Sequence, residues 1–179
     1  MSFENIVQSK RLQSHAGLAD MDVALLKQLR NRQMKNCFRT FEESRYRMEN
    51  VAKIRDTEFI NDAAARTVSA TWFSLKTVSG PIVWIANGSV RSSDYTMLRD
   101  MVSQKVEVLI CVGDNTQQLQ DTFFGLVPIM ETAFTIEEAV HKAFYNKREV
   151  HRIIFSPACD EGDRNEEWGR RYIHEINEL

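Results

Sequence analysis

Apolar residues recur at spacings of three and four over residues 18–41, and this period predicts a long amphipathic helix. The opposite face is basic, and we interpret it as a solvated surface rather than a binding face. No firm period precedes residue 18, so a loose arm is expected there. We assign residues 1–41 to an N-terminal arm with one amphipathic helix, and residues 42–179 to a separate α/β domain. The basic side chains of the helix are Lys27, Arg30, Arg32, Lys35 and Arg39.

Beyond residue 48, short apolar runs alternate with stretches of helical period. Two strands, 48–55 and 57–61, are predicted around a turn at Asp56, and a helix follows at 66–78. Strands that alternate with helices form mostly parallel sheets with helices on both faces, so the pattern predicts an α/β fold. The remaining predicted strands are 81–86, 106–112, 127–131 and 150–155, and the remaining predicted helices are 94–104, 116–124, 135–145 and 166–179.

The composition fits one globular domain and argues against several classes of protein. A chain of 179 residues is long enough for one packed core, and a net charge of -2 with a pI near 6.1 gives no electrostatic attraction to nucleic acid or anionic lipid. The longest apolar runs are too short to span a bilayer, and the N-terminus lacks a basic region followed by an apolar stretch. We therefore expect a cytoplasmic protein that has neither nucleic acid nor a membrane as a partner.

Polar segments follow the predicted strands, where open parallel sheets bind their ligands. None of these segments, at residues 61–66, 87–92, 113–115 and 156–161, is a phosphate-binding loop, because both G-x-x-x-x-G-K-[ST] and G-x-G-x-x-G are absent. Ser156 lacks the G-x-S-x-G context of a nucleophile, and the histidines and cysteines lack metal-ligand spacing. The sequence therefore predicts no catalytic residue, no bound metal and no cofactor held by this chain alone.

Five motifs resemble the C-terminal domain of the Mur ligases in order and spacing, over residues 38–179. Within that family the resemblance is strongest to MurD, which adds D-glutamate to UDP-N-acetylmuramoyl-L-alanine in peptidoglycan synthesis. The resemblance implies a Rossmann-like domain that closes over a separate central ATPase domain and delivers the incoming amino acid to an acyl phosphate. The motifs are Arg45-Tyr46-Arg47-Met48-Glu49, Phe59-Ile60-Asn61-Asp62, Thr71-Trp72-Phe73 with Leu75, Val83-Trp84-Ile85 followed by Ser93-Asp94-Tyr95, and Ile154-Phe155-Ser156-Pro157-Ala158-Cys159.

Five residues in or beside these motifs are our candidates for substrate binding: Asp62, Arg91, Asn61, Arg47 and Ser156. The residues alone leave structural roles open for two of them. The alternative for Asp62 is a cap on the helix that begins near residue 66. The alternative for Arg47 is a surface salt bridge, which contributes little to stability.

The chain departs from the family at three places that concern an anionic substrate. A family lysine after the Asn-Asp pair is replaced by Ala64, and a second family lysine is matched by Arg91, whose charge has a different shape. The residues that hold glutamate in the family are replaced by an acidic segment, 160–163. Like charges about 4 Å apart repel by about 4 kcal/mol at an effective dielectric near 20, so we expect D-glutamate binding to be weak or absent. Arg164 and Arg170 would partly offset this repulsion.

Two functions follow from the resemblance and the departures. The first is a stand-alone, catalytically degenerate domain that acts as a binding or regulatory module related to peptidoglycan precursor synthesis. The second is one subunit of a split ATP-dependent ligase of the D-glutamate type, in which a separate central domain or an intact Mur ligase supplies the ATP and Mg²⁺ sites. Self-association into a homo-oligomer is a further partnership that the sequence leaves open.

A third function comes from the loop after the strand predicted at 81–86. Helix N-termini favour anions, so Asn87, Gly88, Ser89 and Arg91 would bind an anionic or nucleotide-like ligand there. The alternative for this loop is a structural one, in which a side chain of residues 92–94 caps the following helix.

Overall fold

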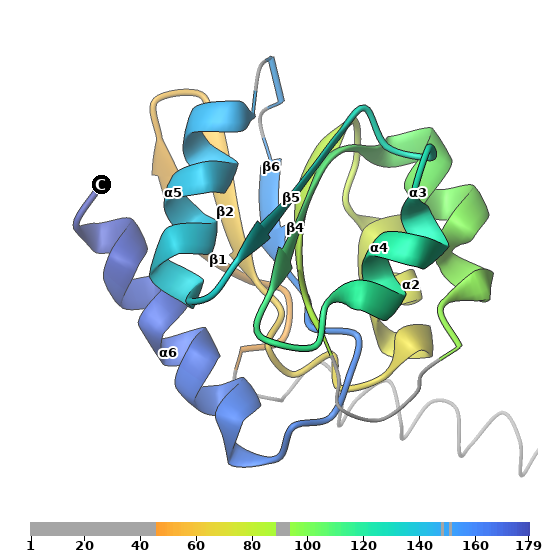
Figure 1. Ribbon diagram of the computed structural model, residues 1–179. Coiled ribbons are helices and arrows are strands. Elements are labelled where there is room, and N and C mark those ends of the chain that lie inside the picture. The colour runs from red at the N-terminus through yellow and green to blue at the C-terminus, as the bar shows by residue number, and fades with distance from the viewer. Residues whose placement is uncertain (1–45, 89–93, 148, 151) are drawn as a thin grey trace, which may run out of the picture. The chain divides into compact units, whose positions relative to one another are not determined.

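Six strands form a single sheet in the order β1-β2-β6-β3-β4-β5 (Figure 1). The structure, a computed structural model, describes residues 46–88, 94–147, 149–150 and 152–179, all within the compact unit Ser44–Leu179. The arm and amphipathic helix predicted for residues 1–41 lie outside the described residues. The strands are β1 (Glu49–Ile54), β2 (Thr57–Asn61), β3 (Ile82–Asn87), β4 (Val106–Val112), β5 (Ile129–Ala133) and β6 (Arg152–Phe155).

The sheet is parallel except at one edge. β1 pairs antiparallel with β2 across a turn at residues 55–56, whereas β2 with β6, β6 with β3, β3 with β4 and β4 with β5 all pair in parallel. The residues of β3 are buried along its whole length, as expected for a parallel strand that is covered on both faces. The mostly parallel α/β sheet and the turn at Asp56 that the sequence predicted are thus confirmed.

Helices cover both faces of the sheet, as Figure 1 shows. The core on one face includes Val83 and Ile85 of β3, and the core on the other face includes Trp84 and Ala86 of the same strand. Successive side chains of a strand point to opposite faces, so β3 contributes to both cores. The first core is closed by α5 (Ile136–Asn146) and α6 (Asp163–Asn177), and the second by α2 (Val68–Thr77), α3 (Arg99–Lys105) and α4 (Gln117–Phe123).

Three local features differ from the sequence prediction. β5 begins at Ile129 rather than at residue 127, because Pro128 has no N–H to give to the ladder. The helix predicted at 94–104 starts with a short 3-10 helix, η1 (Thr96–Leu98), before α3 begins. The N-cap of α2 is Thr67, whose side chain accepts a hydrogen bond from the third N–H of the helix at 3.1 Å. The alternative role of Asp62 as the cap of this helix is therefore wrong.

The ammonium of Lys105 caps the C-terminus of α2. Lys105 Nζ donates to the carbonyl oxygens of Leu75, Lys76 and Val78 at 3.0, 2.9 and 2.7 Å. The last turn of a helix leaves carbonyls without partners in the helix, and a cation there also meets the negative end of the helix dipole. One side chain at the end of α3 thus fixes the end of α2.

We expect Lys105→Met to lower the free energy of unfolding by about 1–3 kcal/mol, because three carbonyls lose a charged donor while the aliphatic stem is kept. Urea denaturation followed by circular dichroism measures the difference. The matched control is Lys76→Met, which removes an exposed ammonium from the same helix end and should cost less than about 1 kcal/mol. Equal losses in the two variants would contradict the capping role.

Candidate functional site

Asp62 lies in the turn directly after β2, at the carboxyl edge of the sheet. Its backbone N–H donates to Phe155 O at the end of β6 at 2.8 Å, so the turn is held by both strands. The Asp62 side chain is fully buried, and Oδ1 lies 2.8 Å from Nη1 of Arg47, whose side chain is 2% exposed. The two residues form a buried ion pair, so the alternative role of Arg47 in a surface salt bridge is wrong.

Hydrogen bonds from neighbouring elements complete this ion pair. Met48 N donates to Asp62 Oδ1 at 3.2 Å, and Ser156 Oγ donates to Asp62 Oδ2 at 2.9 Å. Ser156 Oγ also lies 2.9 Å from Thr71 Oγ1 of α2. Because the Ser156 proton is directed at Asp62, Thr71 is the donor in the second contact. We call Arg47, Asp62, Thr71 and Ser156 the Asp62 network; it ties α2 and the end of β6 to the turn after β2.

Burial sets the electrostatics of the Asp62 network. Burial raises the pKa of Asp62 to about 6, while the Arg47 guanidinium, the hydroxyls of Ser74 and Ser156 and the N–H of Met48 act in the opposite direction. Burial also lowers the pKa of Arg47, an effect that the Asp62 carboxylate opposes. Each charge is costly to remove from water and is compensated mainly by the other. A carboxyl group that is shielded on all sides reaches no substrate in this conformation, whatever its pKa.

The backbone on both sides of Arg47 has an unusual conformation. Tyr46 and Met48 have φ angles of 62° and 47°, in the left-handed region that few residues other than glycine adopt. The hydrogen bond from Ala64 N to Tyr46 O at 3.2 Å holds the first of them, and the bond from Met48 N to Asp62 holds the second. This backbone path turns the Arg47 side chain toward the interior.

Asn61 joins the same turn to α6. Its Nδ2 donates to Gly169 O at 2.9 Å, and its Oδ1 accepts from Ala63 N at 3.1 Å. A Cβ on Gly169 would lie 2.7 Å from the Cβ of Ala63 and 3.3 Å from the ring of Tyr46. The absence of a side chain at Gly169 therefore lets α6 approach the turn after β2 closely.

The structure brings four of the five candidate residues together, at the carboxyl edges of β2 and β6. Arg47, Asp62 and Ser156 belong to the Asp62 network, Asn61 lies beside it, and all four are buried. Arg91 lies outside the described residues. Thr71 was not among the predicted residues, although its place in the Thr71-Trp72-Phe73 motif was the signal that could have identified it.

The loop after β3 is packed against its neighbours. Asn87 N donates to Pro157 O at 3.3 Å, and Gly88 N donates to Val112 O at 3.0 Å, so the two described N–H groups of this loop are already used within the domain. Asp94 Oδ1 accepts a hydrogen bond from Thr96 N in a turn ahead of η1, but the N-caps of η1 and α3 are Tyr95 and Leu98, and neither makes a side-chain cap bond, so Asp94 is not the helix cap expected of a residue in 92–94. Ser89 and Arg91, the other members of the proposed anion site, lie outside the described residues.

The acidic segment 160–163, which follows Ser156, forms ion pairs with some of the arginines near it. Arg66 lies 3.7 Å from Asp160 and 3.2 Å from Glu166, and Arg164 lies 3.8 Å from Glu161. Next to these pairs an open groove of about 480 Å³ runs along the first half of α6. We call it the α6 groove; the residues that line it are Tyr46, Asp163, Glu166, Glu167 and Arg170. The lining thus has three carboxylates and one guanidinium, and two of the carboxylates also pair with arginines outside the lining, Glu166 with Arg66 and Glu167 with Arg171.

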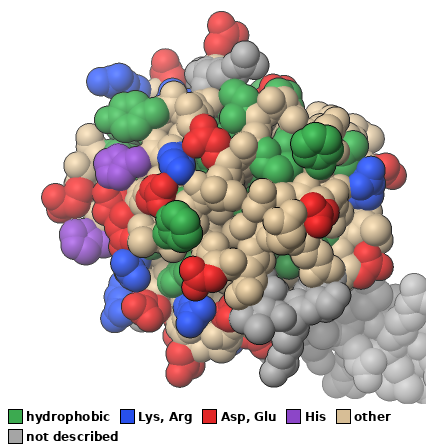
Figure 2. Space-filling view, in the orientation of Figure 1, with side chains coloured by type: hydrophobic (Ala, Val, Ile, Leu, Met, Phe, Trp, Pro, Cys, Tyr) green, Lys and Arg blue, Asp and Glu red, His purple; other side chains and the backbone are tan. Residues whose placement is uncertain are grey.

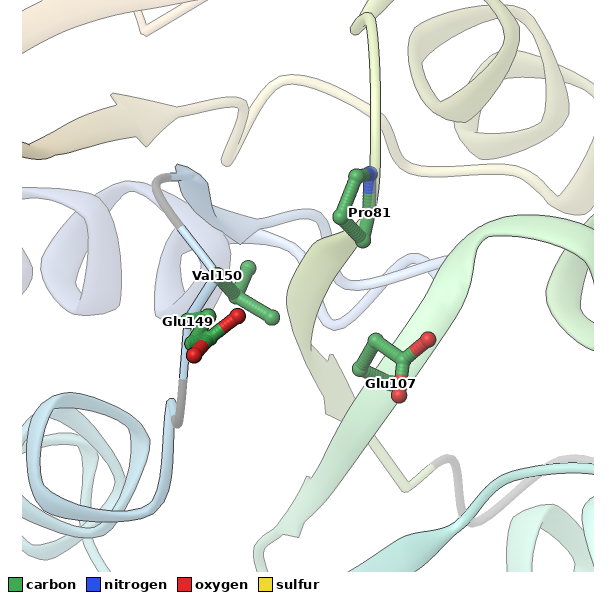
Figure 3. A pocket seen from close by; sticks show the side chains of 4 residues that line it. All are labelled: Pro81, Glu107, Glu149 and Val150. Carbon is green, nitrogen blue, oxygen red and sulfur yellow. The ribbon is translucent and has the colours of Figure 1, made fainter.

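A second cavity lies at the other end of the sheet. It has a volume of about 510 Å³, and Figure 3 shows Glu149 and Val150 on one side of it, Glu107 of β4 on the other, and Pro81 ahead of β3. These residues lie at the amino-terminal ends of the parallel strands. None of the described candidate residues lines this cavity.

Within the ranges that the structure describes, no group of three His, Cys, Asp or Glu side chains is placed to hold a metal ion. No helix in those ranges combines the length and the apolar character needed to cross a bilayer.

The fold and the residues that follow its strands define a Mur ligase-like α/β domain. In sequence, the chain is homologous to part of the UDP-N-acetylmuramoylalanine–D-glutamate ligases. It is 28% identical to that of Christiangramia forsetii over 179 residues, which is 98% of this chain and 40% of the relative. It is 34% identical to that of Chloroherpeton thalassium over 67% of this chain and 25% of the relative, and 32% identical to that of Chlorobaculum tepidum over 75% and 29%. The chain thus spans between a quarter and two fifths of the length of these relatives.

Solved structures agree on the fold. The murein peptide ligase Mpl of Psychrobacter arcticus matches 75% of this chain and 30% of its own with a TM-score of 0.54 and 10% identity. MurF of Acinetobacter baumannii matches 73% and 31% with a TM-score of 0.51 and 14% identity. No protein-family model matches the chain. The resemblance to the Mur ligases is confirmed, and the match over 98% of the chain extends it ahead of residue 38.

Proposed function

We propose that this chain is a Mur ligase-like domain that acts as a binding or regulatory module of the cytoplasm and does not hold D-glutamate itself. The α6 groove is the observation that carries the proposal. It is the open surface beside the candidate residues, and its lining has three carboxylates and one guanidinium. A dicarboxylate placed there would be repelled by Asp163, and by Glu166 and Glu167 as far as Arg66 and Arg171 leave their charges uncompensated.

The Asp62 network offers no alternative anchor for an anion. A ligand carboxylate would have to displace Asp62 from Arg47, and breaking a buried ion pair costs about 3–5 kcal/mol. The hydroxyl of Ser156 is also used, because it donates to Asp62. The polar side chains of the family motifs therefore make contacts within the domain. These contacts stabilise the fold more directly than they contribute to substrate binding.

Titration calorimetry of the whole chain with D-glutamate tests the proposal, and we expect no saturable heat up to millimolar ligand. Glu166→Gln/Glu167→Gln removes two negative charges from the α6 groove and should raise any residual affinity. The matched control is Glu175→Gln/Glu178→Gln, which removes two charges from the far end of the same helix and should have no effect. Saturable binding of D-glutamate by the unmodified chain would contradict the proposal.

A second candidate function is favoured by one observation, the intact pairing of Arg47, Asp62 and Ser156. It makes the chain a subunit of a split D-glutamate-type ligase, with ATP and Mg²⁺ bound by a separate central domain or an intact Mur ligase. Mixing the chain with such a protein, the muramyl-alanine nucleotide, D-glutamate and ATP is the test. ATP hydrolysis that needs both proteins and both substrates would favour the split ligase, and no gain on mixing would leave only the binding module.

A further inference from the structure

Among the strands that the structure describes, β5 forms an edge of the sheet, and its outward backbone groups can be identified. In the strand order β5 has β4 as its one neighbour. Ala133 O accepts a hydrogen bond from Gly113 N at the end of β4 at 2.9 Å, so the backbone groups of Ala133 face β4. Successive residues of a strand direct these groups to opposite sides, so Met130 and Thr132 direct theirs away from the sheet. An edge of this kind is a template for pairing with another chain.

Charged side chains from α5 occupy part of this edge. Lys142 Nζ donates to Thr132 O at 2.6 Å, and Glu138 Oε2 accepts from Phe134 N at 2.8 Å. The two side chains also pair with each other at 2.7 Å. We call Lys142 and Glu138 the edge guard. Pro128, directly ahead of β5, adds to it because it has no N–H to give to an incoming strand.

The start of α5 fixes the position of the edge guard. Glu138 N donates to Thr135 Oγ1 at 3.2 Å, while the Glu138 carboxylate reaches back to Phe134 N. This reciprocal arrangement resembles a capping box and sets the direction of the Glu138 side chain. Lys142 lies one turn later on the same face of α5, which runs alongside β5 (Figure 1). The guard is thus built into a helix end whose geometry is well determined.

Two exposed aromatic side chains lie before and after β5 in the sequence. Phe124 and Phe134, shortly before and directly after β5, are 83% and 77% exposed. Figure 2, drawn from the side of β5 and α5, shows acidic, basic and apolar side chains interspersed on this face. If the charged side chains near β5 were absent, exposed apolar residues of this kind would favour the pairing of another strand with β5. The opposite edge is protected in another way, by the bulge in β1 between Asn50 and Ala52.

We propose that Lys142, held by Glu138, closes the β5 edge against a second copy of this chain, and that loss of the Lys142 ammonium opens the edge to antiparallel self-pairing once the charge of Glu131 is also removed. Two-fold pairing of identical edges aligns Met130 of each copy with Thr132 of the other, so the outward donors and acceptors match. The same pairing places Glu131 of one copy directly opposite Glu131 of the other, and like charges so placed repel. Glu131 is therefore a second barrier, and because its Oε2 lies 4.0 Å from Lys142 Nζ, the Glu131→Gln variant is the reference against which loss of Lys142 is measured.

Sedimentation equilibrium of the full chain tests the edge guard with a matched control. Glu131→Gln removes the charge repulsion but keeps an oxygen for Asn146 Nδ2, which donates to Glu131 at 2.6 Å, and it should leave the mass unchanged from that of the unmodified chain. Glu131→Gln/Lys142→Met also removes the guard and should shift the mass toward a dimer at the same concentration. Equal masses for the two variants would overturn the proposal. If Glu131→Gln alone shifts the mass toward a dimer as far as the double variant does, the proposal is overturned too, because charge repulsion is then the whole barrier.

A cross-linking experiment locates the interface. In the antiparallel pair the two residues 131 are directly opposite, so Glu131→Cys/Lys142→Met should form an intermolecular disulfide on oxidation, whereas Glu131→Cys alone should not. A dimer of the double variant that forms no such disulfide places the interface elsewhere and overturns the proposal. Lys142→Gln replaces Lys142→Met if the far-ultraviolet circular dichroism of the latter departs from that of the unmodified chain. None of these outcomes depends on the ligand of the α6 groove.

Discussion

Replacing Arg47 with methionine is expected to lower the free energy of unfolding by about 3–5 kcal/mol, because it leaves the Asp62 carboxylate buried without its counter-charge. Asp62 is fully buried, and its Oδ1 lies 2.8 Å from the guanidinium that would be lost. The other groups that favour the charged carboxylate, Met48 N and the hydroxyls of Ser74 and Ser156, are neutral and compensate a buried charge only in part. Guanidinium or urea denaturation at pH 7 measures the loss.

A second substitution separates the ion pair from the space that Arg47 fills. Arg47→Met/Asp62→Asn has no buried charge, while the amide still accepts from Met48 N and donates to Ser156 Oγ, so it should recover a substantial part of the lost stability. The exposed control is Arg164→Met, whose guanidinium is paired with Glu161 at 3.8 Å and should cost less than about 1 kcal/mol. If the double variant is no more stable than Arg47→Met, the buried charge is not the source of the loss.

Gly88→Ala should destabilise the domain by about 1–3 kcal/mol or more, since the new Cβ has no room. Gly88 is buried directly after β3, and an ideal Cβ built there would collide with the backbone of Asn115 and Thr116. Backbone atoms cannot rotate aside as a flexible side chain can, so the two loops must separate. Thermal and urea unfolding report the loss, and proteolysis in the loops after β3 and β4 should become faster.

The control for Gly88→Ala is Gly125→Ala. Gly125 has a φ of 73° and nothing within 4 Å of the position of a Cβ, so alanine there meets backbone strain without a steric clash. We expect this variant to lose about 1 kcal/mol. A loss at Gly88 no larger than that at Gly125 would show that the contact with Asn115 is not tight.

The order of elements was predictable because each strand and helix has its own period. The apolar runs that became β3, β4 and β6 and the three-four spacing of α5 and α6 are local patterns, and local patterns are what a sequence displays. Boundaries followed local chemistry as well. Pro128 delays the start of β5, and Thr67 rather than Asp62 caps α2, because the hydroxyl directly precedes the first turn.

The contacts that define the site could be predicted only in part. The family motifs indicated Arg47, Asp62 and Ser156 as related residues. They did not indicate that the three side chains would pair and hydrogen-bond with one another. That outcome depends on burial, which arises when β2, β6 and α2 pack together. The Lys105 cap had no signal at all, since a lysine at a helix end is common and its three acceptors lie 27 to 30 residues away.

The place of β6 in the sheet has a consequence for folding. β6 lies between β2 and β3, yet it is built from residues 152–155, which follow β3, β4 and β5 in the sequence. The β1–β2 hairpin therefore cannot join β3 and β4 until β6 has been synthesised. Pairing between residues so far apart in sequence slows folding, and the edges of β2 and β3 that pair with β6 stay open until β6 is in place. Completion of the sheet therefore depends on a strand that comes later in the sequence than all of its other strands.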